Sequence, residues 1–259
     1  MKLNIVPART GFQWVKLGCQ TFFKQPLALA GLFFMFMAVM SVLAIVPVLG
    51  NVLALALLPA ATLGLMVATQ EATKGKFPMP SILLTGFRAA KPQMRSMLVL
   101  GGIYAACFLL VMGFSSLFDG GKFAKLYLVG GSITRELVME GDFQLAMWST
   151  MALYLPLSMM FWHAPALVYW QGMPPVKSLF FSLMACVRNF AAFTTYGLAW
   201  LGLFALTGMV VTLIAAAMGG PTAAAAVMFP VAMLMAAMFF TSIYFTVRDC
   251  FEATPGESP

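Results

Sequence analysis

Six stretches of this chain run for about twenty residues or more without a charged side chain, the length that a helix needs to cross a hydrocarbon core of about 30 Å. They cover about residues 27–46, 51–70, 96–118, 143–169, 190–218 and 222–247. A membrane β-barrel would instead show short segments of alternating hydrophobicity, and no such alternation occurs. The sequence therefore predicts an all-α fold, a six-span transmembrane helical bundle forming a single integral membrane domain over residues 1–259.

The charge content agrees with this class. Charged residues make up 9% and hydrophobic residues 62% of the 259 positions, whereas soluble domains have about 25% charged and 45–50% apolar residues. The net charge of +7 is spread over short connections between spans. There it favours orientation in the membrane and attraction to anionic lipids, so we expect anionic membrane lipids as partners and no nucleic acid.

The start of the chain and its thiols fit a retained, reduced membrane protein. Residues 1–26 are too polar for the apolar core of a cleavable signal peptide. None of the four cysteines, Cys19, Cys107, Cys186 and Cys250, falls in a segment that we place outside the cell. We therefore expect reduced thiols and no disulfide.

Basic residues separate by side of the membrane. Twelve lie on the side of both termini, here called the basic side: Lys2, Arg9, Lys16, Lys24, Lys74, Lys76, Arg88, Lys91, Arg95, Lys177, Arg188 and Arg248. Three lie on the other side, here called the hairpin side, all within the connection 119–142: Lys122, Lys125 and Arg135. Because lysine and arginine accumulate in cytoplasmic loops, the sequence predicts a multi-pass protein of the bacterial inner membrane with both termini in the cytoplasm.

This orientation predicts a labelling pattern. A cysteine placed within 119–142 of a thiol-free variant should react with an impermeant maleimide in intact cells. One placed near Lys74 should not react, since that connection is predicted to be cytoplasmic. The reverse pattern would contradict the orientation.

Three connections on the basic side are predicted to be helices lying in the membrane interface, at about residues 11–24, 80–91 and 174–188. In 11–24, polar residues recur at helical spacing, while Phe12, Val15, Cys19, Phe22 and Phe23 fill the opposite arc. Such a pattern is typical of a helix whose apolar face lies in the acyl boundary.

The chain can also be divided into three similar units. Each would begin with an interfacial helix near Pro7, Pro80 or Pro175, followed by two spans, as in the internal repeats of many membrane proteins. The alternative is that prolines and interfacial helices are simply common in this class. Internal prolines are expected to kink the spans that hold them: Pro59, Pro156, Pro165 and Pro230.

Several segments resemble a known family. VPARTGFQW, QPLALAGLFF, IVPVLG with LLPA, and WHAPALVYWQGMPPVKSLFFSLMACVRN resemble a family of uncharacterised bacterial inner-membrane proteins over nearly the whole chain. That family is similar in layout to the membrane domains attached to glycerophosphodiester phosphodiesterases. The resemblance implies a multi-span inner-membrane protein and carries no catalytic residues.

Few residues of the sequence indicate catalysis or ion-coupled transport. The spans hold no Asp, Glu, Lys or Arg away from their ends, and proton-coupled transporters usually keep such groups there. Nucleotide-binding, zinc-protease and hydrolase motifs are missing from the sequence. We therefore expect a non-enzymatic protein without a cofactor. A route lined by Ser, Thr and backbone carbonyls at kinked helices leaves transport open.

A soft-metal site is an alternative. His163 is the only histidine, and Met159 and Met160 lie close to it in sequence. Thioethers and thiolates suit Cu(I), so a Cu(I) transporter is one hypothesis. The other interpretation is that methionine fills gaps in the packing, and that His163 bonds a carbonyl freed by Pro165.

Seven basic residues flank the interfacial helices, and we call them the collar: Lys16, Lys24, Arg88, Lys91, Arg95, Lys177 and Arg188. They are predicted to hold lipid headgroups, or only to enforce orientation. The leading hypothesis is a protein that binds or moves an amphipathic, lipid-like molecule. The alternative is an accessory subunit of a larger membrane complex, with a membrane-protein partner or a second copy of the chain.

Overall fold

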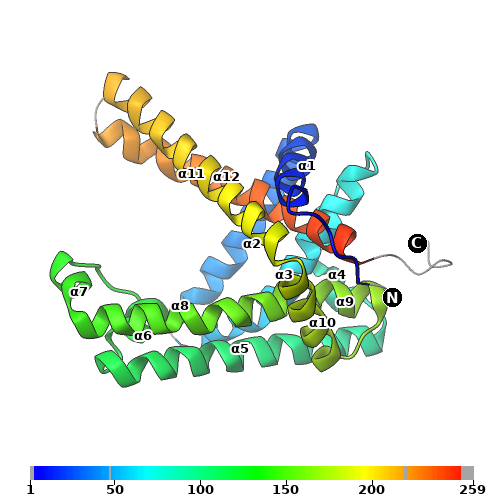
Figure 1. The fold of residues 1–259 in the computed structure, drawn as a ribbon, viewed down its shortest axis with the longest axis horizontal. Coiled ribbons are helices and arrows are strands. Elements are labelled where there is room, and N and C mark those ends of the chain that lie inside the picture. The colour runs from blue at the N-terminus through cyan, green and yellow to red at the C-terminus, as the bar shows by residue number, and fades with distance from the viewer. Residues whose placement is uncertain (1–2, 47, 219–220, 252–259) are drawn as a thin grey trace. The chain divides into compact units, whose positions relative to one another are not determined.

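The computed structural model describes residues 3–46, 48–218 and 221–251, which are almost entirely helical (Figure 1). The helices are α1 (Thr10–Lys24), α2 (Pro26–Ala44), α3 (Leu49–Thr73), the 3-10 helix η1 (Pro80–Leu84), α4 (Thr85–Arg88), α5 (Lys91–Asp119), α6 (Lys122–Leu128), α7 (Arg135–Met139), α8 (Gly141–Trp162), α9 (Ala164–Gln171), α10 (Pro175–Arg188), α11 (Phe190–Met218) and α12 (Pro221–Cys250). Within the described residues, β-structure is confined to an isolated antiparallel bridge between Leu3 and Phe251.

The all-α class and the six spans are confirmed. In the described part of the chain, the helices long and apolar enough to cross a membrane are Pro26–Ala44, Leu49–Thr73, Lys91–Asp119, Gly141–Gln171, Phe190–Ala215 and Ala226–Cys250. The third begins five residues before the apolar run, because the helix continues through its basic first turn. Pro92 is favourable in that turn, because the backbone N–H groups of a first helical turn have no helical acceptor and proline has no N–H.

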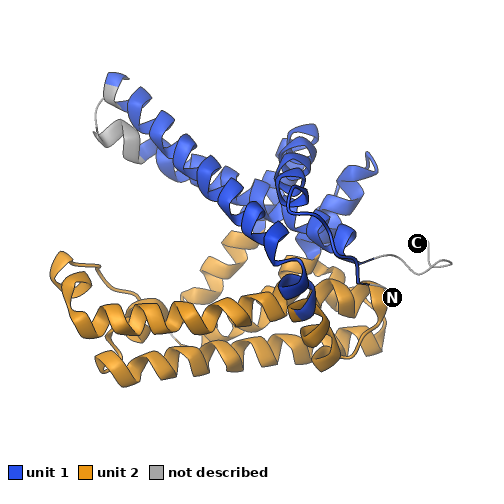
Figure 2. Ribbon diagram, viewed as in Figure 1, with its two compact units in different colours: residues 1–35, 64–83, 184–259 blue, residues 36–63, 84–183 orange. Residues whose placement is uncertain are grey.

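The chain forms two compact units (Figure 2): residues 1–35, 64–83 and 184–259 form unit 1, and residues 36–63 and 84–183 form unit 2. Unit 1 contains α1, α11, α12 and parts of α2, α3 and α10. Unit 2 contains the helices from α4 to α9 with the remaining parts.

In unit 1, α1 packs on α11 and α12, which also pack on each other. Trp14 is fully buried there, and its ring lies 5.2 Å from that of Phe193 and 5.9 Å from that of Tyr196. Its indole N–H donates to Asp249 at 2.9 Å. A Cβ on Gly18 would lie 2.8 Å from the Cα of Ser242, so a glycine is what allows α1 to approach α12 this closely.

Asn189 ties the N-terminal segment to the same unit. Its side-chain oxygen accepts from the backbone N–H of Val6 at 2.7 Å, and its amide nitrogen donates to the carbonyl of Asn4 at 3.0 Å. The N–H of Asn4 donates to the carbonyl of Cys250 at 2.9 Å. Asn189 is buried, and buried amides are expected to be satisfied in this way.

In unit 2, α5 packs on α8 along its length, and also on α9. The rings of Tyr104 on α5 and Phe161 on α8 lie 4.9 Å apart. A Cβ on Gly101 would overlap the carbonyl oxygen of Ala56 on α3. Small residues permit such close backbone approach between spans, where burial against lipid gives no hydrophobic driving force.

One kind of contact occurs three times. In each, a helix on the basic side lies against the second helix of a hairpin through a small residue. In α1, Gly18 lies against Ser242 of α12, and in α4 a Cβ on Gly86 would lie 3.2 Å from Ala60 of α3. In α10, the Ser182 hydroxyl contacts α8. The predicted three-unit repeat requires such equivalent contacts, although the repeat itself stays a prediction.

Residues 80–91 are not one helix. The 3-10 helix η1 leads into α4, which ends at Arg88, and Ala89 and Ala90 are extended, with ψ of 166° and 149°. The new helix begins at Lys91 with Pro92 in its first turn. Because a proline lacks an N–H and clashes with the preceding turn, a helix that continued from Arg88 through Pro92 would be destabilised, whereas Pro92 in the first turn of a new helix is favourable.

Candidate functional site

All seven collar side chains are exposed. Arg88, Lys91 and Arg95 follow one another on α4 and the first turns of α5, in unit 2 with Lys177. The rest of the collar, Lys16, Lys24 and Arg188, belongs to unit 1. Each unit therefore presents its own group of basic side chains.

Ion pairing distinguishes the collar from three other basic residues of the basic side, Lys74, Lys76 and Arg248. Lys74 and Lys76 each lie 3.7 Å from Glu71, and Arg248 lies 2.7 Å from Asp249. Across residues 3–46, 48–218 and 221–251, no collar residue forms an ion pair; the Lys177 ammonium lies 5.9 Å from the centre of the Phe181 ring. The collar charges are thus not neutralised by carboxylates of the described chain.

The apolar arc of α1 divides differently from the prediction. Val15 and Phe22 are buried within unit 1, whereas Phe12 and Phe23 are 63% and 68% exposed. The cause is the close packing of α1 on α11 and α12, which takes the middle of the predicted membrane face into the protein. The exposed aromatic rings lie on the same helix as the exposed Lys16 and Lys24.

An open hollow lies on this exposed side of α1. It is lined by Cys19, Gln20, Phe23 and Lys24. The Lys24 ammonium and the Gln20 amide can form polar contacts with a ligand, and the Phe23 ring beside them can form an apolar contact. Burial raises the pKa of the Cys19 thiol, so this cysteine stays protonated and acts as a small apolar group.

His163 marks a break between α8 and α9, where the fourth span is interrupted two residues before Pro165. Its backbone N–H donates to the Ser182 hydroxyl at 2.9 Å, and that hydroxyl donates to the Met159 carbonyl at 2.7 Å. Ser182 thereby forms hydrogen bonds with two backbone groups at the break. One faint signal for this role was available in the sequence, because Ser182 lies between apolar residues, Phe180 and Phe181 before it and Leu183 and Met184 after it.

The proposed metal ligands lie in an apolar setting. His163 is fully buried, and Met159 and Met160 are half-buried. Within the described residues, no group of three or more His, Cys, Asp or Glu side chains is placed to hold a metal ion. Burial raises the pKa of Cys186, which disfavours its thiolate. Binding of Cu(I) by thioethers stays a prediction.

The predicted kink sites fall into two groups. Pro59, Pro156 and Pro230 lie inside the unbroken helices α3, α8 and α12. Pro165 lies in the first turn of α9, just after the break at His163. Kinks at the three internal prolines stay predictions.

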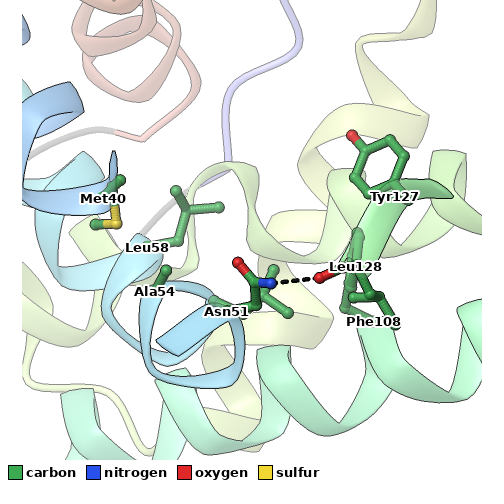
Figure 3. A pocket seen from close by; sticks show the side chains of 8 residues that line it. Met40, Asn51, Ala54, Leu58, Phe108, Tyr127 and Leu128 are labelled. Atoms are coloured by element: carbon green, nitrogen blue, oxygen red, sulfur yellow. Dashed lines mark hydrogen bonds between the residues drawn. The ribbon is translucent and has the colours of Figure 1, made fainter. Parts of the chain in front are cut away.

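A pocket in unit 2 was not foreseen from the sequence (Figure 3). Its cavity volume is about 190 Å³. The Asn51 side-chain amide donates to the carbonyl of Leu128 beside it. The rest of the lining is mainly carbon: Met40, Ala54, Leu55, Leu58, Phe108 and Tyr127. The signal available in the sequence was a polar side chain, Asn51, at the start of a predicted span. Nothing in the sequence indicated that it contacts the connection 119–142.

Comparison with known proteins agrees with the fold and the class. No family model matches the chain, and no solved structure matches it. The chain is 38% identical over 254 residues to a protein of Burkholderia thailandensis described as a "probable inner membrane protein", covering 97% of this chain and 94% of that protein. The more distant resemblance to the membrane domains of glycerophosphodiester phosphodiesterases stays a prediction. The chain therefore belongs to the family of this bacterial inner membrane protein.

Proposed function

We propose that this protein is a non-enzymatic inner-membrane protein that binds an anionic, amphipathic molecule of the lipid class through its collar. The observation that carries the proposal is that the exposed collar charges form no ion pair with any described residue, in contrast to three other basic residues of the same side. Lys74, Lys76 and Arg248 have carboxylate partners, while the exposed collar residues have none in the described part of the chain. Unpaired arginines at the interface suit phosphate groups.

The surroundings of the collar support an amphipathic ligand over a purely ionic one. Phe12 and Phe23 are exposed on the same helix as Lys16 and Lys24, and Phe23 and Lys24 line one hollow. A basic amphipathic helix in this arrangement binds both the charge and the acyl region of anionic lipids. The first acidic residue of the whole chain is Glu71. The basic residues of α1 therefore have no carboxylate near them in sequence.

The proposal predicts that lipid retention depends on collar arginines. Each basic residue near the surface contributes about 1 kcal/mol of attraction to anionic lipid, or roughly fivefold in affinity. Arg88→Gln with Arg188→Gln should therefore strongly reduce the anionic lipid that co-purifies, as measured by native mass spectrometry. Arg88→Lys with Arg188→Lys should cause a smaller loss, because lysine keeps the charge but not the planar bidentate geometry.

Arg248→Lys is the matched control. Arg248 lies on the basic side like the collar arginines but bonds to Asp249 at 2.7 Å, so lipid retention should not change. If the double lysine variant retains as much lipid as the wild type and keeps its orientation, the collar acts only as an orientation signal.

A further inference from the structure

The pocket around Asn51 lies at the hairpin side of the spans, whereas the collar belongs to the basic side. It is lined by α2 near its end, by α3 near its start, by Phe108 of α5 and by the last residues of α6. From Asn51 to Leu58 it follows α3 for roughly 10 Å, since a helix rises about 1.5 Å per residue. Half of a hydrocarbon core is about 15 Å thick, so the pocket runs from the interface into one leaflet.

The size and lining of this pocket suit a chain rather than a compact ligand. Its volume of about 190 Å³ is below the roughly 300–1,000 Å³ of sites that enclose a whole small molecule. The one side-chain amide in its lining, that of Asn51, already donates to the Leu128 carbonyl. What remains for a ligand is mainly carbon surface, including the Phe108 and Tyr127 rings, whose centres lie 6.0 Å apart.

The connection 119–142 beside the pocket differs in charge from the collar. It holds four carboxylates, Asp119, Glu136, Glu140 and Asp142, and three basic groups, Lys122, Lys125 and Arg135. Asp119 accepts from the backbone N–H groups of Gly121 and Phe123. Lys122 pairs with Glu140, and this hydrogen bond raises the pKa of the Lys122 ammonium.

Charges of both signs remain exposed on this connection, namely Glu136 and Asp142 with Lys125 and Arg135. Lys125 lies three residues before Leu128 on α6, which places both on one side of that helix. A headgroup that carries both an ammonium and a phosphate complements such a surface. A headgroup that is only anionic complements it poorly.

We propose that this pocket holds an acyl chain of a zwitterionic phospholipid from the leaflet at the hairpin side. The inference deepens the proposed function, because it gives a lipid-binding protein a second site with a different headgroup preference. The two sites are independent, so loss of one leaves the other.

The test uses photoactivatable phospholipids. The full-length protein is reconstituted in nanodiscs with a phosphatidylethanolamine that carries a diazirine on its acyl chain. After irradiation, labelled peptides are mapped by mass spectrometry. Labelling should concentrate on the pocket residues Met40, Leu58 and Phe108. Phosphatidylglycerol with the same acyl chain should label these positions roughly tenfold less, which corresponds to about 1.4 kcal/mol.

Ala54→Phe fills the pocket and should reduce this labelling by a similar factor. Leu53→Phe is the matched control, because Leu53 is the neighbouring residue, is 46% exposed and does not line the pocket. Labelling of the wild type spread evenly over exposed faces of α2, α3 and α5 would overturn the proposal, whether or not Ala54→Phe folds. Equal labelling by the two lipids would overturn the headgroup assignment.

The collar variants separate this inference from the proposed function. Arg88→Gln with Arg188→Gln should leave the pocket labelling unchanged while reducing co-purified anionic lipid. If pocket labelling fails while the collar still retains anionic lipid, the proposed function stands without this second site.

Discussion

Replacing Gly101 by alanine should destabilise the protein, whereas the same change at Gly102 should not. A Cβ on Gly101 would overlap the carbonyl oxygen of Ala56, and it would lie 3.0 Å from the carbonyl carbon. The obstacle is backbone, so the two helices α3 and α5 must move apart. Forcing extra volume into a packed interface costs about 1–3 kcal/mol, and occasionally more. Thermal unfolding in detergent should show a midpoint several degrees lower.

Gly102 provides the control within the same turn of α5. A Cβ there meets no atom within 4 Å. Alanine is favoured over glycine in a helix by about 1 kcal/mol in soluble systems, so Gly102→Ala should leave the midpoint unchanged or raise it. If both variants unfold alike, α3 and α5 do not approach as closely as described, and the wall of the Asn51 pocket that these helices form would be in doubt.

The spans could be predicted because they depend on local properties of the sequence. An apolar run of sufficient length has only the helix as a way to satisfy its backbone in lipid. The start of α12 at Pro221 follows from a turn residue, whereas Gly50, which was expected in a turn, lies in the first turn of α3. The helix predicted at 11–24 was likewise recognisable from a local property, the spacing of its polar residues. The one predicted at 174–188 was recognisable from its proline start, its apolar residues and its basic end at Arg188.

What could not be predicted depends on contacts between distant segments. The arc of α1 that resembles a membrane-facing surface is partly a protein interface, because Gly18 permits contact with Ser242. An amphipathic pattern reports that one face avoids water, but lipid and protein are equally apolar partners. Nothing in the pattern therefore tells Phe22, which is buried, from Phe23, which is exposed.

The candidate sites show the same division. The collar was found from sequence because charge near a span is a local signal. The Asn51 pocket was missed because Leu128, which accepts from Asn51, lies 77 residues away along the chain. The role of Ser182 was missed for a similar reason, since its partners Met159 and His163 are on another helix.

Trp14 should be the side chain of α1 whose loss costs most. It is 0% exposed, contacts the Phe193 and Tyr196 rings, and donates to Asp249. Truncating a buried aromatic residue to alanine costs about 3–5 kcal/mol. Trp14→Ala should therefore lower the unfolding midpoint by more than any collar variant. Trp14→Phe keeps a ring but removes the N–H donor, so its effect should be intermediate.

Trp148→Ala is the matched control, since Trp148 is 61% exposed on α8 and its loss opens no cavity in the core. The comparison also links stability to the proposed function. Lys16 and Lys24 are positioned by the docking of α1 on α11 and α12, so Trp14→Ala should reduce retained anionic lipid although no charge is changed. Equal unfolding midpoints for Trp14→Ala and Trp148→Ala would mean that α1 is not docked. If α1 is undocked and lipid retention is unchanged, Lys16 and Lys24 bind lipid as part of a free basic helix. Their position on the folded protein would then not matter for binding.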